Sequence, residues 1–576
     1  MRHPLFIACL FLLICCHSAI GQIGSGKIHV VIDQRDEDHP IRIKQPRGGV
    51  DSTNLNTYLA ALRYDIIKDG FLAASFDTVI RSGDTAVAQL VAGRRYKWAN
   101  LTRGNVREEM LGKAGYRQKF FKGTPFNPVQ TARLIESLLD QAENEGFPFA
   151  QVKFDKIAFK DDSISAVLDM TLNNYTVIDS IIIKGGLAAN RKVIENHLGL
   201  EKNAPYNQQK LNRIPVRLRE LPYVKVIKPF ELGMRDGKAD VYLYLDNKKA
   251  SNFDGVIGVL PDPVTGDIVF TGDVTLDLMN SLRRGETINL RWQRLQTRTQ
   301  QLDLRFEYPF LFNTPLGIEL KANLFRQDTL FSQVNLNAAL QYYFQGGKQI
   351  KIFVEDAQAN VISPSAYQQG RFVDSRTTMF GLGTAINTLD YRFNPRSGYF
   401  IEAQAAAGTK RIQENPEVDE SFYDDINTNS EIYNVNILAG LHIPIGRQST
   451  LLLRVRGGYF LNENMFQNEA YRIGGLKSIR GFNEQTIFAT GYTIGTMEFR
   501  YLLEANSNVF LFVDQGVYEN RINQDLEQDT PIGFGGGINF ETGAGIFSLT
   551  YALGRQFDNN IELRGGKIHF GFVSFF

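Results

Sequence analysis

From Ser251 to the last residue, hydrophobic and polar residues alternate with a period of two, and the helical periodicity of the first half disappears. Such alternation is typical of strands whose two faces meet different surroundings. Segments of about ten residues match the span of a tilted membrane strand, and an even number of strands lets a barrel close. We therefore predict a 16-stranded antiparallel transmembrane β-barrel over residues 251–576. The strands are predicted at Ser251–Leu260, Asp267–Leu278, Glu286–Gln296, Gln300–Phe310, Leu316–Arg326, Ser332–Phe344, Lys348–Ala357, Arg376–Thr388, Ser397–Gly408, Glu431–Ile443, Ser449–Phe460, Thr490–Leu503, Asn508–Tyr518, Pro531–Glu541, Gly545–Gln556 and Gly566–Phe576.

The connections between these segments differ in length on the two sides of the predicted barrel. Counted from the first strand, the even-to-odd links are short, for example "QGG", "NPR" and "TGA". The odd-to-even links include the long ones, near Asn360–Ser375, Thr409–Ser430, Leu461–Ala489 and Glu519–Thr530. Short turns on the periplasmic side and long loops outside are the pattern of outer-membrane barrels.

The first half of the chain contains a repeat. Gly70, Gly146 and Pro222 each stand next to an aromatic residue and are spaced 76 and 76 residues apart. A fixed period of this size predicts an array of similar small domains. The predicted domains are 22–93, 94–174 and 175–250.

Each repeat follows the same order of elements. A strand comes first (Lys27–Asp33, Arg94–Leu101 and Val177–Lys184), and a helical stretch follows, such as the one-faced stripe of Leu55, Leu59, Leu62 and Ile66. A glycine–aromatic turn then leads into two alternating strands, as at Gln151–Lys160 and Ser163–Leu172. The pattern predicts an α+β unit of the order β-α-α-β-β. The exposed sheet edges of such units can accept an extended peptide, although units that act only as spacers fit the sequence equally well.

The N-terminus has the features of a secretory signal peptide, predicted over residues 1–21. Arg2 supplies the positive charge, Leu5–Cys16 is an apolar run, and small residues precede Gln22. A lipoprotein site at Cys15 or Cys16 is an alternative, although Leu13 and Ile14 lack the small pair that such a site prefers. All three cysteines lie in this segment, so the remaining chain is predicted to be exported without disulfides.

Charge and hydropathy limit the classes of partner and the ways in which the chain could cross a membrane. Without Arg2, 62 Lys and Arg residues stand against 62 Asp and Glu, and a global nucleic-acid footprint is missing. No stretch after the signal segment is long and apolar enough for a transmembrane helix. A membrane location therefore requires the closed barrel.

Four motifs within the barrel segment resemble those of a known superfamily. "GGLKSIRGF" contributes Gly474, Gly475, Ser478, Arg480, Gly481 and Phe482 to a motif in the longest outer loop. "DYRFNPRSGY" contributes Asp390, Pro395 and Gly398 to a periplasmic turn, "GTMEFRY" contains Glu498, and "LFVDQGVY" contains Asp514. In this order, after three repeats, they resemble the bacterial superfamily of POTRA domains followed by an outer-membrane assembly barrel, which includes BamA and TamA. Three POTRA-like repeats are closest in layout to TamA.

The resemblance implies a role for the arginine of this loop. In the superfamily the loop folds back into the barrel, and its arginine meets acidic residues on the inner wall. Carried over, Arg480 would pair with Glu498 and Asp514, because a guanidinium offers a planar fork of donors to carboxylates. Phe510, Phe512 and Asp514 share one parity along their strand, but the sequence leaves open whether this parity faces inward. The alternative interpretation is that Arg480 is an exposed arginine in a mobile loop.

The first and last predicted strands form a candidate seam. Gly255, Gly258 and Gly571 weaken strand pairing there, so the seam could open toward lipid and template a new strand. The last strand places Ile568, Phe570, Phe572 and Phe576 on one face, which predicts a lipid-facing, aromatic-ended strand. The tail departs from the superfamily's terminal signal at Ser574, which puts the recognition of this strand in question.

The resemblance implies a bacterial outer-membrane protein whose repeats lie in the periplasm. Its expected function is assembly or translocation of unfolded outer-membrane or secreted polypeptides, with the lipid bilayer and periplasmic bridging proteins or lipoproteins as further partners. Two alternatives stay open: a dedicated two-partner-type secretion pore, and lipid transport to the outer membrane with a periplasmic bridging partner. The sequence lacks G-x-S-x-G and H-E-x-x-H motifs, so we expect no enzyme activity, catalytic residue, metal or cofactor, and no nucleic acid.

Overall fold

The computed structural model describes residues 27–575, apart from residues 36–40, 42, 44–48, 262–267, 297–298, 345–346, 364–366, 368–369, 392–393, 417, 523–524, 544, 558 and 562–564. The predicted signal segment and Phe576 therefore lie outside the described residues. The chain divides into two compact units. The first consists of residues 1–177, 205–209 and 236–238, and the second of residues 178–204, 210–235 and 239–576.

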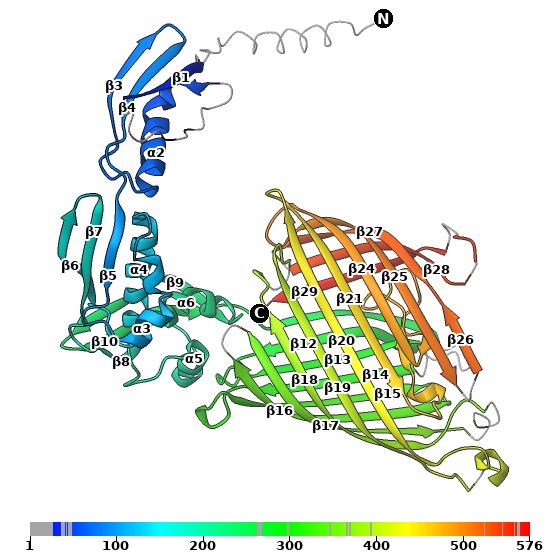
Figure 1. Cartoon of the computed structure of the whole chain (residues 1–576). Helices are drawn as coiled ribbons and strands as arrows, with labels where there is room; N and C mark the ends of the chain where they lie inside the picture. The colour runs from blue at the N-terminus through cyan, green and yellow to red at the C-terminus, as the bar shows by residue number, and fades with distance from the viewer. Residues whose placement is uncertain are drawn as a thin grey trace, which may run out of the picture. The chain divides into compact units, whose positions relative to one another are not determined.

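The first repeat is a four-stranded sheet with one described helix (Figure 1). Strands β1 (Lys27–Gln34), β2 (Val50–Asp51), β3 (Ser75–Ser82) and β4 (Thr85–Val91) lie in the order β2-β1-β4-β3. Helix α2 (Leu55–Lys68) packs Leu55 and Leu59 against Ala86 and Ala88 of the sheet. The expected order has one more helix before α2, and most residues between β1 and β2 lie outside the described part.

The second repeat has the complete expected order. Strand β5 (Lys97–Thr102) is followed by helices α3 (Glu108–Lys113) and α4 (Pro128–Asn144), and then by strands β6 (Gln151–Lys160) and β7 (Ser163–Thr171). Asn127 caps α4 by accepting a hydrogen bond from the Gln130 amide, and Pro128 occupies the first helical turn, where its missing amide hydrogen leaves no partner unsatisfied. Leu134, Leu138 and Ala142 then fall on one helix face and are buried against the sheet.

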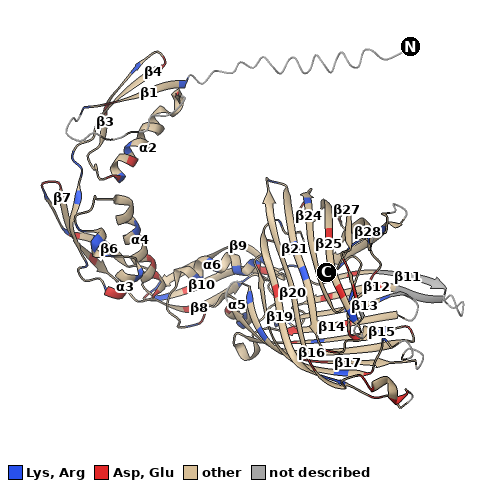
Figure 2. Cartoon of the chain, turned by 45° about the vertical axis from the view of Figure 1, so that its right-hand side comes forward, with Lys and Arg blue, Asp and Glu red and all other residues tan. Residues whose placement is uncertain are grey.

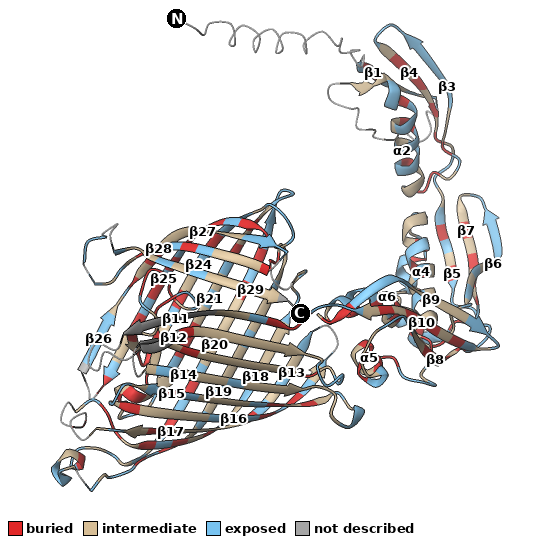
Figure 3. Cartoon of the chain, turned by 180° about the vertical axis from the view of Figure 1, so that it is seen from behind, coloured by how far each residue is buried: buried red, intermediate tan, exposed pale blue. Residues whose placement is uncertain are grey.

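The third repeat shows the same order in β8 (Val177–Lys184), α5 (Arg191–Leu198), α6 (Gln208–Arg219), β9 (Val224–Arg235) and β10 (Lys238–Asn247). In every repeat the last strand lies inside the sheet and buries alternate residues, for example Val241, Leu243 and Leu245 of β10. The strand before it, β3, β6 or β9, forms a sheet edge and is exposed over most of its length (Figure 3).

The second half is a closed antiparallel barrel of sixteen strands, as predicted (Figure 1). A short strand, β26 (Asp525–Asp529), extends the circuit between β25 and β27. The strands of the circuit are β11 (Asn252–Pro261), β12 (Ile268–Met279), β13 (Thr287–Gln296), β14 (Thr299–Tyr308), β15 (Leu316–Gln327), β16 (Phe331–Phe344), β17 (Lys348–Val361), β18 (Ser375–Asn387), β19 (Gly398–Ile412), β20 (Asn429–Ile445), β21 (Ser449–Leu461), β24 (Gly491–Leu502), β25 (Asn508–Ile522), β27 (Ile532–Thr542), β28 (Gly545–Arg555) and β29 (Lys567–Phe575).

The two faces of the barrel wall differ in polarity, which is what the alternation predicts. Leu336, Ile352 and Leu382 point outward and expose large apolar surfaces. Charged residues also lie along the strands (Figure 2), and Glu319 and Lys351 form an ion pair of 2.8 Å on the buried parity of β15 and β17. The apolar side of these strands therefore faces away from the lumen, as a barrel in lipid requires.

Several predicted loops contain additional regular structure. The segment Glu519–Thr530 was expected to be a loop, but β25 continues to Ile522 and β26 pairs with its end. The long loop after β21 contains a small hairpin, β22 (Tyr471–Ile473) with β23 (Ile487–Ala489). Periodicity could not predict β26 or the hairpin, because strands this short show no repeating pattern. Among the described helices, none is both long and apolar enough to cross a membrane.

Candidate functional site

The candidate site is centred on residues 462–490, the loop between β21 and β24. Its hairpin packs Ile473, Ile479 and Ile487 against Ile494 of β24 and Tyr518 of β25. These contacts place the loop against the barrel's inner wall, because Ile494 and Tyr518 lie on the buried parity of their strands. The loop therefore enters the lumen.

Arg480 contacts two acidic residues of that wall. Its Nε and Nη2 donate to the two carboxylate oxygens of Asp514, at 2.8 Å each, and its Nη1 donates to Glu498 at 2.5 Å. Its backbone amide also donates to Asp514, at 3.1 Å. The exposed fractions are 6% for Arg480, 4% for Glu498 and 0% for Asp514, so the ion pairs are shielded from water.

The alternation of β25 accounts for the position of Asp514. Phe510, Phe512 and Asp514 are buried, whereas Leu511 and Val513 are exposed. The parity that the sequence left open therefore faces inward. Phe512, two residues before Asp514, places its ring 3.4 Å from the Arg480 guanidinium carbon, a cation–π contact.

Three further polar residues complete the site, and the sequence reasoning missed them. Arg500 donates to Glu498 at 2.6 Å, and the Thr496 hydroxyl donates to Asp514 at 2.8 Å. Arg454 of β21 donates to that hydroxyl at 3.2 Å. Thr496 and Arg500 lie on the same face of β24 as Glu498, so the alternation of this strand could have predicted that they lie beside it.

Two glycines allow the loop backbone to lie this close to the wall. Gly481 has a φ of 95°, and a Cβ there would lie 2.4 Å from the Leu553 carbonyl oxygen of β28. A Cβ on Gly533 of β27 would lie 1.9 Å from the carbonyl oxygen of Arg480. Side chains at both positions would push the loop off the wall.

The remaining residues of the loop motif shape the turn around Arg480. The Ser478 hydroxyl accepts a hydrogen bond of 2.7 Å from the Gly474 amide, and the Gly475 amide donates to the Ile479 carbonyl at 3.1 Å. Phe482 is buried in the same cluster as Ile479. The structure thus brings the whole predicted motif together with Glu498 and Asp514.

The second predicted motif, Asp390, Pro395 and Gly398, forms the turn between β18 and β19. The Asp390 carboxylate accepts from the Arg396 amide at 3.0 Å and from the Ser397 hydroxyl at 3.1 Å. A Cβ on Gly398 would lie 2.4 Å from the Thr388 carbonyl oxygen. The turn is therefore closed by its own residues, and it does not contact Arg480.

At the seam, β11 and β29 pair over a short stretch. Asn252, Phe253 and Asp254 lie opposite Phe575, Ser574 and Val573, whereas β11 pairs with β12 from Asn252 to Pro261. Gly255 directly follows the last paired residue of β11, and Gly571 lies two residues before Val573. Gly258 pairs with Thr271 of β12, and Phe576 is outside the described residues. The pairing thus stops where the predicted glycines begin.

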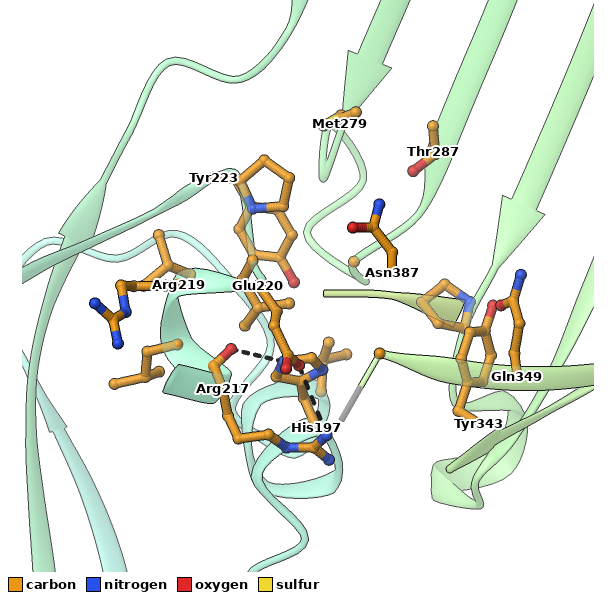
Figure 4. A pocket seen from close by; sticks show the side chains of 18 of the residues that line it. His197, Arg217, Arg219, Glu220, Tyr223, Met279, Thr287, Tyr343, Gln349 and Asn387 are labelled. Carbon is orange, nitrogen blue, oxygen red and sulfur yellow. Dashed lines mark hydrogen bonds and ion pairs between the residues drawn. The ribbon is translucent and has the colours of Figure 1, made fainter. Parts of the chain in front are cut away.

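A cavity of about 1610 Å³ lies where the third repeat meets the barrel (Figure 4). It is bounded by Arg217, Glu220 and Tyr223 of the repeat and by Tyr343 and Asn387 of the barrel. The cavity also reaches Arg305 and Glu402 at the end of the lumen. It therefore joins the lumen to the space beside the third repeat.

Polar contacts hold the third repeat beside this cavity. The Asn190 amide donates to the Arg283 carbonyl at 2.8 Å, and the Asn280 side-chain amide donates to the Ala188 carbonyl at 3.2 Å. The Tyr223 hydroxyl has no hydrogen-bond partner among the described residues. Burial raises the pKa of Tyr223 above its ordinary value, so this phenol stays neutral.

Comparison with known proteins decides the family. An Omp85 superfamily domain matches residues 280–576, which is more than half of the chain. The chain belongs to the Omp85 superfamily. No curated protein matches it. A 16-stranded Omp85 barrel is an outer-membrane protein of bacteria, and its class serves assembly and translocation at that membrane in the general sense.

Two solved structures of CdiB show the same fold at low sequence identity. CdiB from Escherichia coli is 11% identical, with a TM-score of 0.54, covering 91% of this chain and 98% of that one. CdiB from Acinetobacter baumannii is 13% identical, with a TM-score of 0.54, covering 84% and 90%. BamA from Haemophilus ducreyi lacking POTRA domains 1–3 is 13% identical, with a TM-score of 0.43, covering 83% and 100%.

Proposed function

We propose that this protein is an outer-membrane assembly or translocation factor whose repeats lie in the periplasm and capture unfolded polypeptides. The barrel then inserts or translocates these substrates with the help of the seam between β11 and β29. The observation that carries the proposal is the short pairing at that seam: among the described residues, most of β11 has no hydrogen-bonded neighbour on the β29 side. Unpaired backbone groups of this kind accept an incoming strand.

The repeats supply a matching capture surface. Each of the edge strands β3, β6 and β9 exposes an apolar residue: Ile80 is 53% exposed, Phe159 63% and Ile227 53%. An extended substrate could pair with such an edge and place a side chain against the apolar residue. The proposal assigns no catalytic residue, metal or cofactor. The free energy comes from substrate folding and burial of apolar surface in the bilayer.

A second candidate, a dedicated secretion pore, is favoured by one observation. The cavity of about 1610 Å³ joins the lumen to the space beside the third repeat, which provides an entry for a polypeptide that crosses through the lumen. In such a pore the seam would stay closed during transport. Lipid transport has no comparable observation in its favour.

Quantitative mass spectrometry of outer membranes after depletion of this protein tests the proposal. Loss of several unrelated barrel proteins is the expected result for an assembly factor. Loss of one exported protein with unchanged barrels would replace the proposal with the dedicated pore. An unchanged protein profile would overturn both and direct attention to outer-leaflet lipids.

A further inference from the structure

The loop that carries Arg480 also contacts the opposite side of the barrel. The guanidinium carbon of Arg472 lies 3.5 Å from the ring centre of Phe325 on β15, and its Nη1 donates to the Gln333 side chain on β16 at 3.2 Å. Gln485 donates to Gln301 of β14 at 2.7 Å. In the sixteen-strand circuit, β15 and β25 are eight steps apart in either direction. The loop thus crosses the lumen from wall to wall.

The two arginines hold the loop with contacts of different strength. Arg480 engages two carboxylates through charge-assisted hydrogen bonds and a backbone amide contact. Arg472 is half-buried in the lumen, and among the described residues no carboxylate lies within ion-pair distance of it. Its partners are an aromatic ring and a neutral amide. Contacts of a cation with neutral groups are weaker than charge-assisted hydrogen bonds to two carboxylates, so the Arg472 contact is the weaker of the two.

We propose that Arg472 is the latch of a gate formed by residues 462–490, and that Arg480 is its hinge. The closed gate blocks the lumen. Opening breaks the Arg472 and Gln485 contacts with β13–β16 and leaves the Arg480 ion pairs intact. This inference deepens the proposed function, because a translocating polypeptide or an inserting strand needs a lumen that is closed at rest. In this arrangement Arg472 is a positioning residue that acts through the loop.

Ion conductance of the purified full-length protein in planar lipid bilayers tests the latch without any substrate. Arg472→Met keeps the length of the side chain and removes its charge and hydrogen bond. We expect a several-fold rise in the fraction of time that the pore conducts. Arg472→Lys retains a cation above Phe325 and is expected to restore part of the closed state. Arg371→Met, at an exposed loop arginine, is the matched control and should conduct as the unchanged protein does.

A reversible tether keeps the proposal testable where Arg472→Met folds poorly. The chain has no cysteine after Cys16, so a double variant with Arg472→Cys and Gln333→Cys contains one engineered pair. Because the two natural side chains are joined only at their tips, a bifunctional thiol reagent with a reducible spacer is used to bridge the two cysteines. Crosslinking should hold the pore closed, and reductive cleavage of the spacer should release it to the conductance of Arg472→Met. Heat-modifiable migration in gels checks that each barrel is folded.

Two results would overturn the latch: equal conductance of Arg472→Met and Arg371→Met in folded barrels, or equal conductance of the crosslinked and the cleaved pair. Because these measurements use no substrate, their failure would leave the proposed function standing. Failure of the depletion experiment would likewise leave the gate unaffected.

Discussion

The wall at β24 and β25 and the seam at β11 and β29 close the same barrel in opposite ways. β24 pairs with β25 from Gly491 to Leu502, and the buried ion pairs of Arg480 lie across these two strands. β11 pairs with β29 only from Asn252 to Asp254 among the described residues. The comparison teaches that one side of the barrel is built to stay closed, whereas the other is closed by few hydrogen bonds.

The largest expected effect comes from breaking the strong side. Arg480→Ala leaves Glu498 and Asp514 buried without their shared cation, which typically costs about 3–5 kcal/mol. We expect a lower unfolding temperature and a loss of most of the assembly activity. Arg371→Ala, at an exposed arginine, is the control for which no loss is expected. Equal and negligible effects at both positions would show that the ion pairs do not support function. Arg298, a second candidate control, lies outside the described residues.

The next effect is expected from locking the weak side. Phe253 and Ser574 lie opposite each other at the seam, so Phe253→Cys with Ser574→Cys is placed for a disulfide. We expect the oxidised form to lose assembly activity and the reduced form to regain it. The matched pair Thr493→Cys with Val517→Cys crosslinks β24 to β25 and should leave activity unchanged in both states. Full activity of the oxidised seam pair would show that the seam stays closed during function.

A moderate effect is expected at an edge strand of the repeats. Phe159→Lys places a charge on the exposed apolar position of β6. We expect binding of unfolded barrel peptides to weaken about fivefold, which corresponds to about 1 kcal/mol. Fluorescence anisotropy with labelled peptides measures this, and Arg133→Ala on the exposed side of α4 is the control. Unchanged peptide affinity would remove β6 from the capture surface.

The smallest effect is expected beside the cavity. Tyr223→Phe removes a buried hydroxyl that has no hydrogen-bond partner among the described residues. Because no partner is left unpaired, the free energy of unfolding should change by less than about 1 kcal/mol and should not fall. Chemical denaturation of the purified protein measures the difference. A clear loss of stability would reveal a contact of this hydroxyl with water or substrate.

The sequence predicted much of the fold because membrane strands obey a simple alternation. Gln151–Lys160 in the second repeat has the predicted bounds, and the barrel strands differ from prediction by a few residues at their ends. Alternation cannot identify β22 and β26, because strands of three and five residues are too short to show a periodic pattern. The predicted strands before long loops also end too early: Lys348–Ala357 continues to Val361, and Asn508–Tyr518 continues to Ile522.

The candidate site was less accessible to sequence reasoning. Arg480, Glu498 and Asp514 came from a resemblance between motifs, because no local pattern relates residues on three separate segments. The sequence analysis did not identify Arg472 as a lumen contact. Its hydrogen-bond partner Gln333 lies 139 residues earlier in the chain, and Phe325 lies earlier still. Contacts across a lumen depend on which strands face each other, and that order emerges only when the barrel closes.

The exposed apolar residues of β3, β6 and β9 have a consequence for the kinetics of capture. Under the proposed function, three weak sites in one covalent chain would act as a multivalent binder, because a substrate held at one edge would stay at a high effective concentration near the next. Each edge can then release quickly while the substrate as a whole remains bound. Three weak edge sites would thus retain a substrate strongly overall, while each single site still releases it quickly.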